Sequence, residues 1–573
     1  MRILLLATAF NSLTQRVFAE LGDLGHTVAV EQVADEDQVR AAAGRHASEL
    51  IIAPMLRTAI PRDIWSAHTC LIVHPGPEGD RGPSSLDWAI HERAERWGVT
   101  VLQAEEEMDA GPVWASVPCP VPAVGKSDLY RNEVSDAAME AVLLAVDRFA
   151  SGTYVPLPHR GPSRTRPYLR QVERRIDWSA DPTQTVLRKL RAADSQPGVR
   201  DELLGEDWFL HGGHPEDRLR GRPGELLATR AGAVCRATSD GAVWIPQLRH
   251  RPADGSRGIT LPATLALGDR LRGLAPLPEQ GPEQGPEQGT ETWTDIRYAE
   301  SGPVGVLRFS FPGGAMSTSQ CRRLLDAYRS ACARPTSVLV LGAARDFFSN
   351  GIHLGVIEAA ADPAAESWAN INAMDDLAEA VLTTTDRLVV AALGGNAAAG
   401  GVMLALAADE VWCRRGVVLN PHYRLMGLYG SEYWTYSLPR RVGTGTAREL
   451  TRRALPVSAA SAVGIGLADR LVECGPEAFG AEVARLAALL AGTPGLQSRI
   501  AAKKADLERQ EVVKPLAAYR AAELARMRRI FFDPDEPYHA LRRAFVRKEP
   551  LGKVTGTAQL DVALRRGAGY QGP

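Results

Sequence analysis

The chain has 573 residues, which is long enough for several domains. Its 66 basic and 68 acidic residues give a formal net charge of −2, so no overall attraction to nucleic acid or to an anionic membrane is expected. No stretch approaches the roughly 18 consecutive apolar residues of a membrane span. The N-terminal MRILLLATAF reads as a strand and not as a signal peptide. Seven scattered cysteines without a C-x-x-C motif favour a reducing, cytoplasmic location and no metal site.

The first 168 residues alternate predicted strands with predicted helices. A helix is expected from the loop at 11–14 to about Leu24, and strands are expected at 2–7, 27–30, 49–54 and 71–73. This alternation predicts a Rossmann-like, mostly parallel sheet that is covered on both sides. No G-x-G-x-x-G follows the first strand, so the sequence does not support a nicotinamide site.

A histidine ends the fourth predicted strand and opens a loop rich in glycine and proline, HPGPEGDRGPSSLDW at 74–88. Open α/β sheets bind ligands at the carboxyl ends of their strands, which makes His74 a candidate catalytic residue. The alternative is a histidine that only hydrogen-bonds the loop. Ser84 or Ser85 is expected to cap a helix whose first turn carries Asp87.

A second region, 169–275, has one helical stretch followed by short apolar runs separated by glycine and aspartate. This spacing predicts a small β-barrel domain. The motif HGGH at 211–214 is more typical of a solvated loop than of a metal site. Three tandem PEQG repeats then predict an exposed linker, which we place at 276–294.

The last region, 295–573, again alternates strands and helices. Its predicted strands are VGVLRFSF, TSVLVLGA and RLVVAALG. The segment GGNAAAGGVMLALAADE allows close backbone packing and presents free N–H groups where a helix begins. Helices are expected from Phe479 to the end, including an amphipathic basic helix near 540–548, whose charges could simply form a solvated face.

The first half resembles the formyl-transferase fold of folate-dependent enzymes, which carry H-P-x-L-L-P-x-x-R-G and L-D-x-G. His74 matches the histidine, Arg81-Gly82 matches R-G, and Asp109 in MDAG matches the aspartate. Ile72 replaces the asparagine of methionyl-tRNA formyltransferases, which argues against formylation of an amine. Three later segments resemble the β-barrel domain that follows in tRNA formyltransferases, namely RRIDWSADPTQTVLRKLRA, GRPGELL and DGAVWI.

This resemblance implies that His74 and Asp109 are the catalytic acid–base pair. Arg81 is a candidate for substrate contact, although a loop arginine more often only positions its loop. APMLRTAIP at 53–61 resembles the loop that lines the pterin pocket. The apolar wall for the pterin would be Met55, Leu56 and Ile60, and core packing explains these residues equally simply.

The second half resembles the crotonase (enoyl-CoA hydratase) superfamily through DFFSNGIHLG and AALGGNAAAGGVMLALAAD. The resemblance implies that the N–H groups of Ile352 and Gly400 form an oxyanion hole for a thioester carbonyl. Met403 and Tyr423 occupy the positions of the two hydratase glutamates, which argues against addition of water to an enoyl thioester.

Glu432 and Tyr423 are candidates for accepting a proton near this oxyanion hole. Glu432 could instead pair with an arginine such as Arg424 or Arg440. The sequence AFVRK resembles the terminal helix of crotonases, which touches the adenosine phosphates of CoA. The cations implied for these phosphates are Arg542, Arg543, Arg547 and Lys548.

The order of the two halves resembles the HoxX family of hydrogenase-maturation proteins. This resemblance implies formyl transfer from N10-formyltetrahydrofolate to coenzyme A, followed by decarbonylation of formyl-CoA. The CO would become an iron ligand in a nickel–iron hydrogenase, so the partners implied are small-molecule substrates and hydrogenase-maturation proteins, with no nucleic acid and no membrane. The alternatives are a formyl hydrolase joined to an acyl-CoA hydrolase or isomerase, or a non-enzymatic maturation scaffold.

Overall fold

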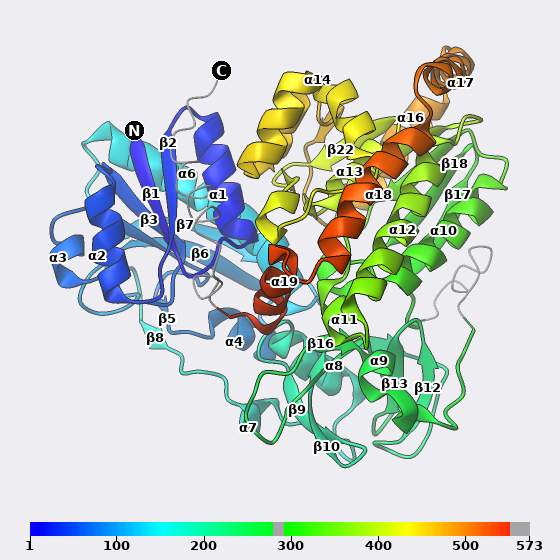
Figure 1. Cartoon of the computed structure of the whole chain (residues 1–573). Coiled ribbons are helices and arrows are strands. Elements are labelled where there is room, and N and C mark those ends of the chain that lie inside the picture. Colours follow the sequence, from blue (N-terminus) through cyan, green and yellow to red (C-terminus); the bar gives the residue numbers. More distant parts are fainter. Residues whose placement is uncertain (279–290, 550–573) are drawn as a thin grey trace. The chain divides into compact units, whose positions relative to one another are not determined.

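The computed structural model describes residues 1–278 and 291–549, and the chain divides into two compact units (Figure 1). Of the described residues, the first unit contains Met1–Arg175 and Arg188–Val199, and the second contains Ile176–Leu187 and the chain from Arg200 to Glu549. The PEQG repeats lie almost wholly outside the described residues, and the end of the predicted exposed linker is wrong, because Thr292 and Trp293 are buried. Within the two described ranges, no helix is long and apolar enough to cross a membrane.

The first unit is built on a six-stranded sheet of order β2 (Thr27–Gln32), β1 (Arg2–Ala7), β3 (Leu50–Met55), β4 (Cys70–His74), β6 (Arg96–Gln103) and β7 (Val113–Pro120). The strands β2, β1, β3 and β4 are parallel, as predicted, whereas β6 and β7 are antiparallel to their neighbours. Helices α1 (Ser12–Asp23) and α6 (Ser135–Ser151) contact each other over one face (Figure 1). On the other face, alternate β1 residues Leu4 and Leu6 pack with Val39 and Ala42 of α2 (Glu36–Arg45).

The loop after β4 contains a two-residue strand, β5 (Asp80–Arg81), that pairs with β8 (Arg164–Thr165). Helix α4 (Ser85–His91) follows, so its predicted start is confirmed. The predicted capping by a serine side chain is wrong, because both hydroxyls are used elsewhere. Ser84 accepts the N–H of Leu169 at 3.3 Å, and Ser85 donates to the Pro75 carbonyl at 2.7 Å.

The small domain contains two antiparallel sheets. One has the order β16 (Thr260–Pro262), β15 (Gln247–His250), β10 (Glu206–His211) and β9 (Val199–Leu203), and the other has the order β11 (His214–Glu216), β14 (Ala242–Ile245), β13 (Ala233–Ala237) and β12 (Leu226–Arg230). The chain bends from one sheet into the other between β10 and β11 and again at Pro246, between β14 and β15.

These bends correct the interpretation of HGGH as a solvated loop for His211 alone, because His214 is exposed, as that interpretation expected. His211 is buried at the end of β10, and the His214 ring on β11 lies 4.5 Å from the Trp293 ring. The glycines between the two histidines supply the bend, and Gly212 has φ +72°. Among residues 1–278 and 291–549, no cluster of three or more His, Cys, Asp or Glu is arranged to hold a metal ion.

The rest of the second unit has a six-stranded sheet of order β17 (Ile296–Ser301), β18 (Val304–Phe309), β19 (Val338–Gly342), β20 (Leu388–Leu393), β22 (Glu410–Arg414) and β25 (Arg470–Val472). Only β17 and β18 are antiparallel. β19 and β20 are buried throughout, as expected for central parallel strands covered on both faces.

A second sheet of the same unit contains β21 (Ala397–Ala398), β23 (Val418–Asn420) and β24 (Val457–Ser458). Helix α12 (Pro363–Leu382) packs between α10 (Thr318–Cys332) and α18 (Leu516–Phe532). The helices predicted after Phe479 are confirmed as far as Arg547, as α16 (Phe479–Ala491), α17 (Leu496–Val513), α18 and α19 (Pro537–Arg547), and the rest of that prediction, from residue 550 on, lies outside the described residues.

Candidate active sites

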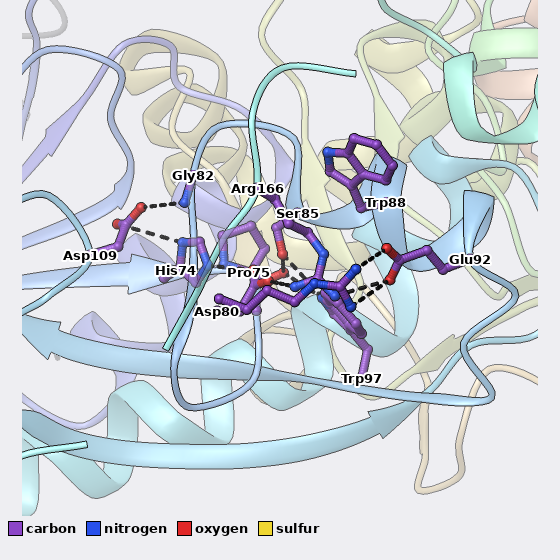
Figure 2. A network of polar contacts seen from close by, with 12 residues as sticks. His74, Pro75, Asp80, Gly82, Ser85, Trp88, Glu92, Trp97, Asp109 and Arg166 are labelled. Atoms are coloured by element: carbon purple, nitrogen blue, oxygen red, sulfur yellow. Dashed lines mark hydrogen bonds and ion pairs between the residues drawn. The ribbon is translucent and has the colours of Figure 1, made fainter. Parts of the chain in front are cut away.

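His74 lies between two carboxylates at the carboxyl end of β4 (Figure 2). Its Nε2 is 3.0 Å from Asp80 Oδ2, and its Nδ1 is 3.6 Å from Asp109 Oδ1. The other oxygen of Asp80 accepts a hydrogen bond from Arg166, and Arg166 Nη2 donates to Glu92 Oε2 at 3.0 Å. The structure thus brings together His74 and Asp109, as predicted, and adds Asp80 and Arg166, which were not predicted from the sequence.

The Asp109 backbone is held in a left-handed conformation with φ +55°. Its Oδ2 accepts the Gly82 N–H at 3.1 Å, so one oxygen faces the loop and the other faces His74. Gly82 has φ +113°, and a side chain there would collide with the Arg166 carbonyl. Residue 82 must therefore be glycine for the loop to reach both Asp109 and β8.

The loop backbone beside His74 is fixed by side chains from β6. Trp97 Nε1 donates to the Pro75 carbonyl at 3.0 Å, and the Thr100 hydroxyl donates to the Gly76 carbonyl at 2.9 Å. A side chain at Gly76 would collide with the His74 ring. The histidine thus has a rigid, closely packed setting, which is what proton transfer at a fixed geometry requires.

The residues predicted to contact the folate lie near the same end of the sheet. Arg81 Nη1 binds Glu107 Oε1 at 2.6 Å, so this arginine ties two loops together. Ile60 is buried in the hydrophobic core, and Leu56 packs against that core. Both positions agree with the alternative that these residues serve core packing. Met55 is half-buried at the end of β3. A role of these four residues in folate binding stays a prediction.

The two segments predicted to form an oxyanion hole lie side by side in the second unit. The Ala398 N–H donates to the Ser349 carbonyl at 2.9 Å, and a Cβ at Gly351 would lie 3.2 Å from the Gly400 nitrogen. Gly400 is the first residue of α13 (Gly400–Leu406), so its N–H has no acceptor within the helix. The segment that contains Ile352 is therefore adjacent to a free helical N–H, as an oxyanion hole requires.

Tyr423 and Glu432 form a buried pair next to Gly400. The Tyr423 hydroxyl donates to Glu432 Oε2 at 2.6 Å, and Glu432 is 1% exposed. A side chain at Gly400 would collide with the Glu432 carboxyl group, which shows how closely the two residues approach. The structure therefore places a tyrosine–carboxyl pair directly beside the predicted oxyanion hole.

The alternative in which Glu432 pairs with an arginine is wrong. Arg440 binds Asp506, and Arg424 donates to the Arg452 carbonyl. Both guanidinium groups are partly solvated, whereas the carboxyl group of Glu432 is fully buried. Its charged neighbours are other carboxyl groups.

These neighbours are Asp375 of α12 and Glu523 of α18, and both are fully buried. Asp375 Oδ1 accepts the Glu432 N–H at 2.7 Å, and Glu523 Oε2 accepts the Tyr433 N–H at 3.0 Å. Burial, followed by the charge of Asp375, raises the pKa of Glu432. Burial also raises the pKa of Asp375 and, together with the charge of Glu432, raises that of Tyr423 well above its ordinary value. This environment favours the protonated form of Glu432.

The backbone around this cluster adopts left-handed conformations at three residues other than glycine. Ala399, Glu432 and Tyr433 have φ values of +48°, +58° and +60°. Such conformations cost free energy and persist only where the surroundings enforce them. Here Asp375 and Glu523 hold the backbone N–H groups of Glu432 and Tyr433. Part of the backbone strain of the chain therefore lies at the predicted site.

We predict that the buried carboxyl groups make stability fall as the pH rises. A carboxyl group whose pKa is raised by folding stabilises the folded state fully below its unfolded pKa, and this contribution is lost as the pH rises through the folded pKa. Urea unfolding between pH 5 and pH 9 should show this loss, and Asp375→Asn should reduce it. Asp376→Asn, at an exposed neighbour that pairs with Arg520, should keep the wild-type slope. Equal slopes for all three proteins would contradict the prediction.

The four cations predicted for CoA lie at the end of α19 in different environments. Arg542 is 3% exposed, donates to Glu358 Oε2 at 2.9 Å and stacks over the Tyr538 ring. Arg543 and Lys548 are exposed, and Arg543 Nε also lies 3.6 Å from Glu358 Oε1. Arg547 is half-buried, and its Nε has no hydrogen-bond partner among the described residues. Arg542 is therefore engaged within the fold, whereas the other three side chains are better placed for an incoming anion.

We predict that Arg542→Met destabilises the protein by about 3–5 kcal/mol, because Glu358 would remain buried without its main cation. Arg543→Ala, one residue along the same helix, should change the free energy of unfolding by about 0.5 kcal/mol or less, because that side chain is 62% exposed and solvent screens its 3.6 Å contact with Glu358. Chemical denaturation measures both changes. Similar small losses for the two variants would mean that the Arg542–Glu358 pair is not structural.

Comparisons with known proteins agree with this architecture. Residues 169–256 match the C-terminal domain of formyl transferases, and residues 304–545 match the enoyl-CoA hydratase/isomerase family. Hydrogenase maturation factor HoxX of Bradyrhizobium diazoefficiens is 46% identical over 558 residues, which cover 97% of this chain and 96% of that protein. Methionyl-tRNA formyltransferase of Roseiflexus castenholzii is 30% identical over 202 residues, which cover 34% of this chain and 63% of that protein.

The crystal structure of HypX from Aquifex aeolicus in complex with tetrahydrofolic acid is 42% identical, with a TM-score of 0.93 over 100% of both chains. The fold and the two sites thus define a formyl-transferase domain fused to a crotonase domain, as the motifs predicted. The chain belongs to the HoxX/HypX family of hydrogenase maturation factors.

Proposed function

We propose that this protein makes CO for hydrogenase maturation. It would transfer a formyl group from formyltetrahydrofolate to the thiol of CoA and then convert formyl-CoA to CO and CoA. The relative crystallised with tetrahydrofolic acid supports the folate, and the crotonase-type domain supports the thioester. Hydrogenase-maturation proteins that receive CO are the expected partners.

In the first step, His74 and Asp109 move the proton. The thiol sulfur bonds to the formyl carbon while the bond from that carbon to the folate nitrogen breaks. One proton therefore leaves sulfur and one arrives at nitrogen, and a histidine beside a carboxylate can carry it. Met55, Leu56, Ile60 and Arg81 are the proposed folate contacts.

In the second step, Ile352 and Gly400 bind the thioester oxygen through their N–H groups. Loss of CO breaks the bond between carbon and sulfur, removes the formyl proton and places a proton on sulfur. Glu432 in its protonated form can supply the proton to sulfur and then accept the formyl proton, with the Tyr423 hydroxyl bound to its other side. The three cations proposed to hold the CoA phosphates are Arg543, Arg547 and Lys548.

The observation that carries the proposal is the Tyr423–Glu432 pair at Gly400. Met403 stands where a hydratase has its first glutamate and is buried in the hydrophobic core, so it offers no group to activate water. The site therefore keeps the means to polarise a thioester, and its acid–base group comes from a different segment of the chain.

The test is to trap CO with deoxyhaemoglobin. The full chain is mixed with formyltetrahydrofolate with and without CoA, and the spectrum of CO-haemoglobin is expected only with CoA. Formate with no CO would overturn the proposal in favour of a formyl hydrolase. Unchanged formyltetrahydrofolate would overturn it in favour of a non-enzymatic scaffold.

A further inference from the structure

We propose that Asp80, held by Arg166, is a positioning residue that fixes the proton of His74 on Nε2 and leaves Nδ1 to carry out proton transfer. This role rests on the formyl transfer proposed above. It concerns the buried network drawn in Figure 2, which extends away from Asp109 on the opposite side of the histidine ring.

The contacts of the His74 ring define its orientation. Nε2 lies 3.0 Å from Asp80 Oδ2, and Nδ1 lies 3.6 Å from Asp109 Oδ1. If the ring were turned over, carbon atoms would face both carboxylates and the hydrogen bond would be lost. Only the observed orientation places one nitrogen toward each aspartate.

The direction of the hydrogen bond between His74 and Asp80 follows from Arg166. Asp80 Oδ1 accepts from Arg166 Nη1, and a carboxylate bound to a guanidinium group acts as an acceptor through both oxygens. Nε2 must therefore be the donor toward Asp80 Oδ2. A neutral imidazole with its proton on Nε2 has its lone pair on Nδ1.

The contact between His74 and Asp109 is longer and more exposed to solvent than the contact between His74 and Asp80. The 3.6 Å separation of Nδ1 and Oδ1 is too long for a direct hydrogen bond, as expected for an unprotonated nitrogen facing an anion. The Asp109 side chain is 18% exposed, whereas that of Asp80 is 1% exposed. A substrate can therefore reach the Nδ1 side, and Asp80 acts only through the ring.

Arg166 is itself fixed on three sides. Besides Asp80, it binds Glu92 Oε2 at 3.0 Å, and its guanidinium group lies 5.0 Å from the centre of the Trp97 ring. Trp97 in turn holds the loop carbonyl of Pro75 at 3.0 Å. The orientation of Asp80 is thus set by the buried Arg166, whose contacts with Glu92 and Trp97 do not depend on substrate.

The chemistry balances with Nδ1 as the reacting atom. Nδ1 accepts the thiol proton as sulfur bonds to the formyl carbon, and it returns this proton to the folate nitrogen as the carbon–nitrogen bond breaks. The Nε2 proton stays on the ring throughout. Asp80 stabilises the positively charged ring that exists between the two transfers.

The resting tautomer is measured first, because it requires no activity. Full-length protein labelled with nitrogen-15 in histidine should give a His74 ring with Nε2 protonated and Nδ1 bare, assigned by the signals that His74→Gln removes. A ring protonated on Nδ1 alone, or on both nitrogens, would overturn the proposal. The tautomer is read from the wild-type chain, and the variant serves only to assign the His74 signals.

The kinetic test uses Asp80→Asn, because an asparagine can present its NH2 group to Nε2 and favour the wrong tautomer. The kcat for release of formyl from formyltetrahydrofolate should fall about 100-fold, with KM changed only a few-fold. Arg166→Lys should give a smaller decrease. Arg170→Ala, at an exposed arginine four residues further along the chain, is the control and should keep the wild-type rate.

An Asp80→Asn variant with wild-type kcat, or with only a raised KM, would overturn the role of Asp80. If the wild-type protein released formyl at a normal rate but formed no CO, the proposed function would be overturned and the role of Asp80 would stand. The two failures are therefore distinguishable.

Discussion

His74→Ala should lower the rate of formyl release from formyltetrahydrofolate by about 10²–10⁴-fold, the usual contribution of a general acid–base group. The histidine is the only group between Asp80 and Asp109 that can take up and return a proton in the described site. Its loss leaves the folate nitrogen without a proton donor. The measurement is single-turnover formation of tetrahydrofolate in the presence of CoA.

CoA binding by the His74→Ala variant should equal that of the wild type, because the proposed CoA contacts are on α19. Asp80 keeps Arg166 as its partner in the variant, so the loop keeps its main ion pair. His46→Ala is the matched control and should retain full activity. This histidine follows α2 directly and pairs with Glu31 of β2. A His74→Ala rate within a few-fold of the wild type would remove the histidine from the mechanism.

The second large effect is expected for Glu432→Gln, which should lower CO formation by about 100-fold or more while leaving formyl transfer intact. Glutamine keeps the shape and can still accept the hydrogen bond of Tyr423, but it can neither give nor take a proton at this position. Formyl-CoA should then accumulate and hydrolyse slowly. Haemoglobin reports CO, and an assay for formate reports the diverted product.

Glu473→Gln, at an exposed glutamate that pairs with Arg415, is the control for Glu432→Gln and should form CO normally. Tyr423→Phe should give an intermediate loss, because it removes one hydrogen bond from the carboxyl group and keeps the proton. Unchanged CO formation by Glu432→Gln would place the proton transfer on another group.

The sequence predicted those features that depend on local pattern. The strand Cys70–His74 ends at the histidine, as its apolar run indicated, and α4 begins at Ser85 after a loop that glycine and proline mark clearly. The proximity of His74 to Asp109, and of the segment that contains Ile352 to Gly400, came from matched motifs.

The missed residues depend on contacts between distant segments. Asp80 and Arg166 are 86 positions apart, and they meet because two strands of only two residues each pair in parallel. Such short strands have no hydrophobic period. Asp375 and Glu523 lie within helices, where an acidic residue ordinarily suggests a solvated face, and only the packing of α12 against α18 shows that both are buried.

The pairing of β5 with β8 also has a consequence for folding. Arg166 must return from beyond α6 before Asp80 has a cation, so the histidine site is completed by one of the longest-range contacts in its unit. Contacts of large sequence separation form late, because the intervening chain must first be ordered. During synthesis, the six strands of the first sheet would all emerge before the segment that completes the site, and the nascent sheet would remain catalytically incomplete until the chain had grown past Arg166.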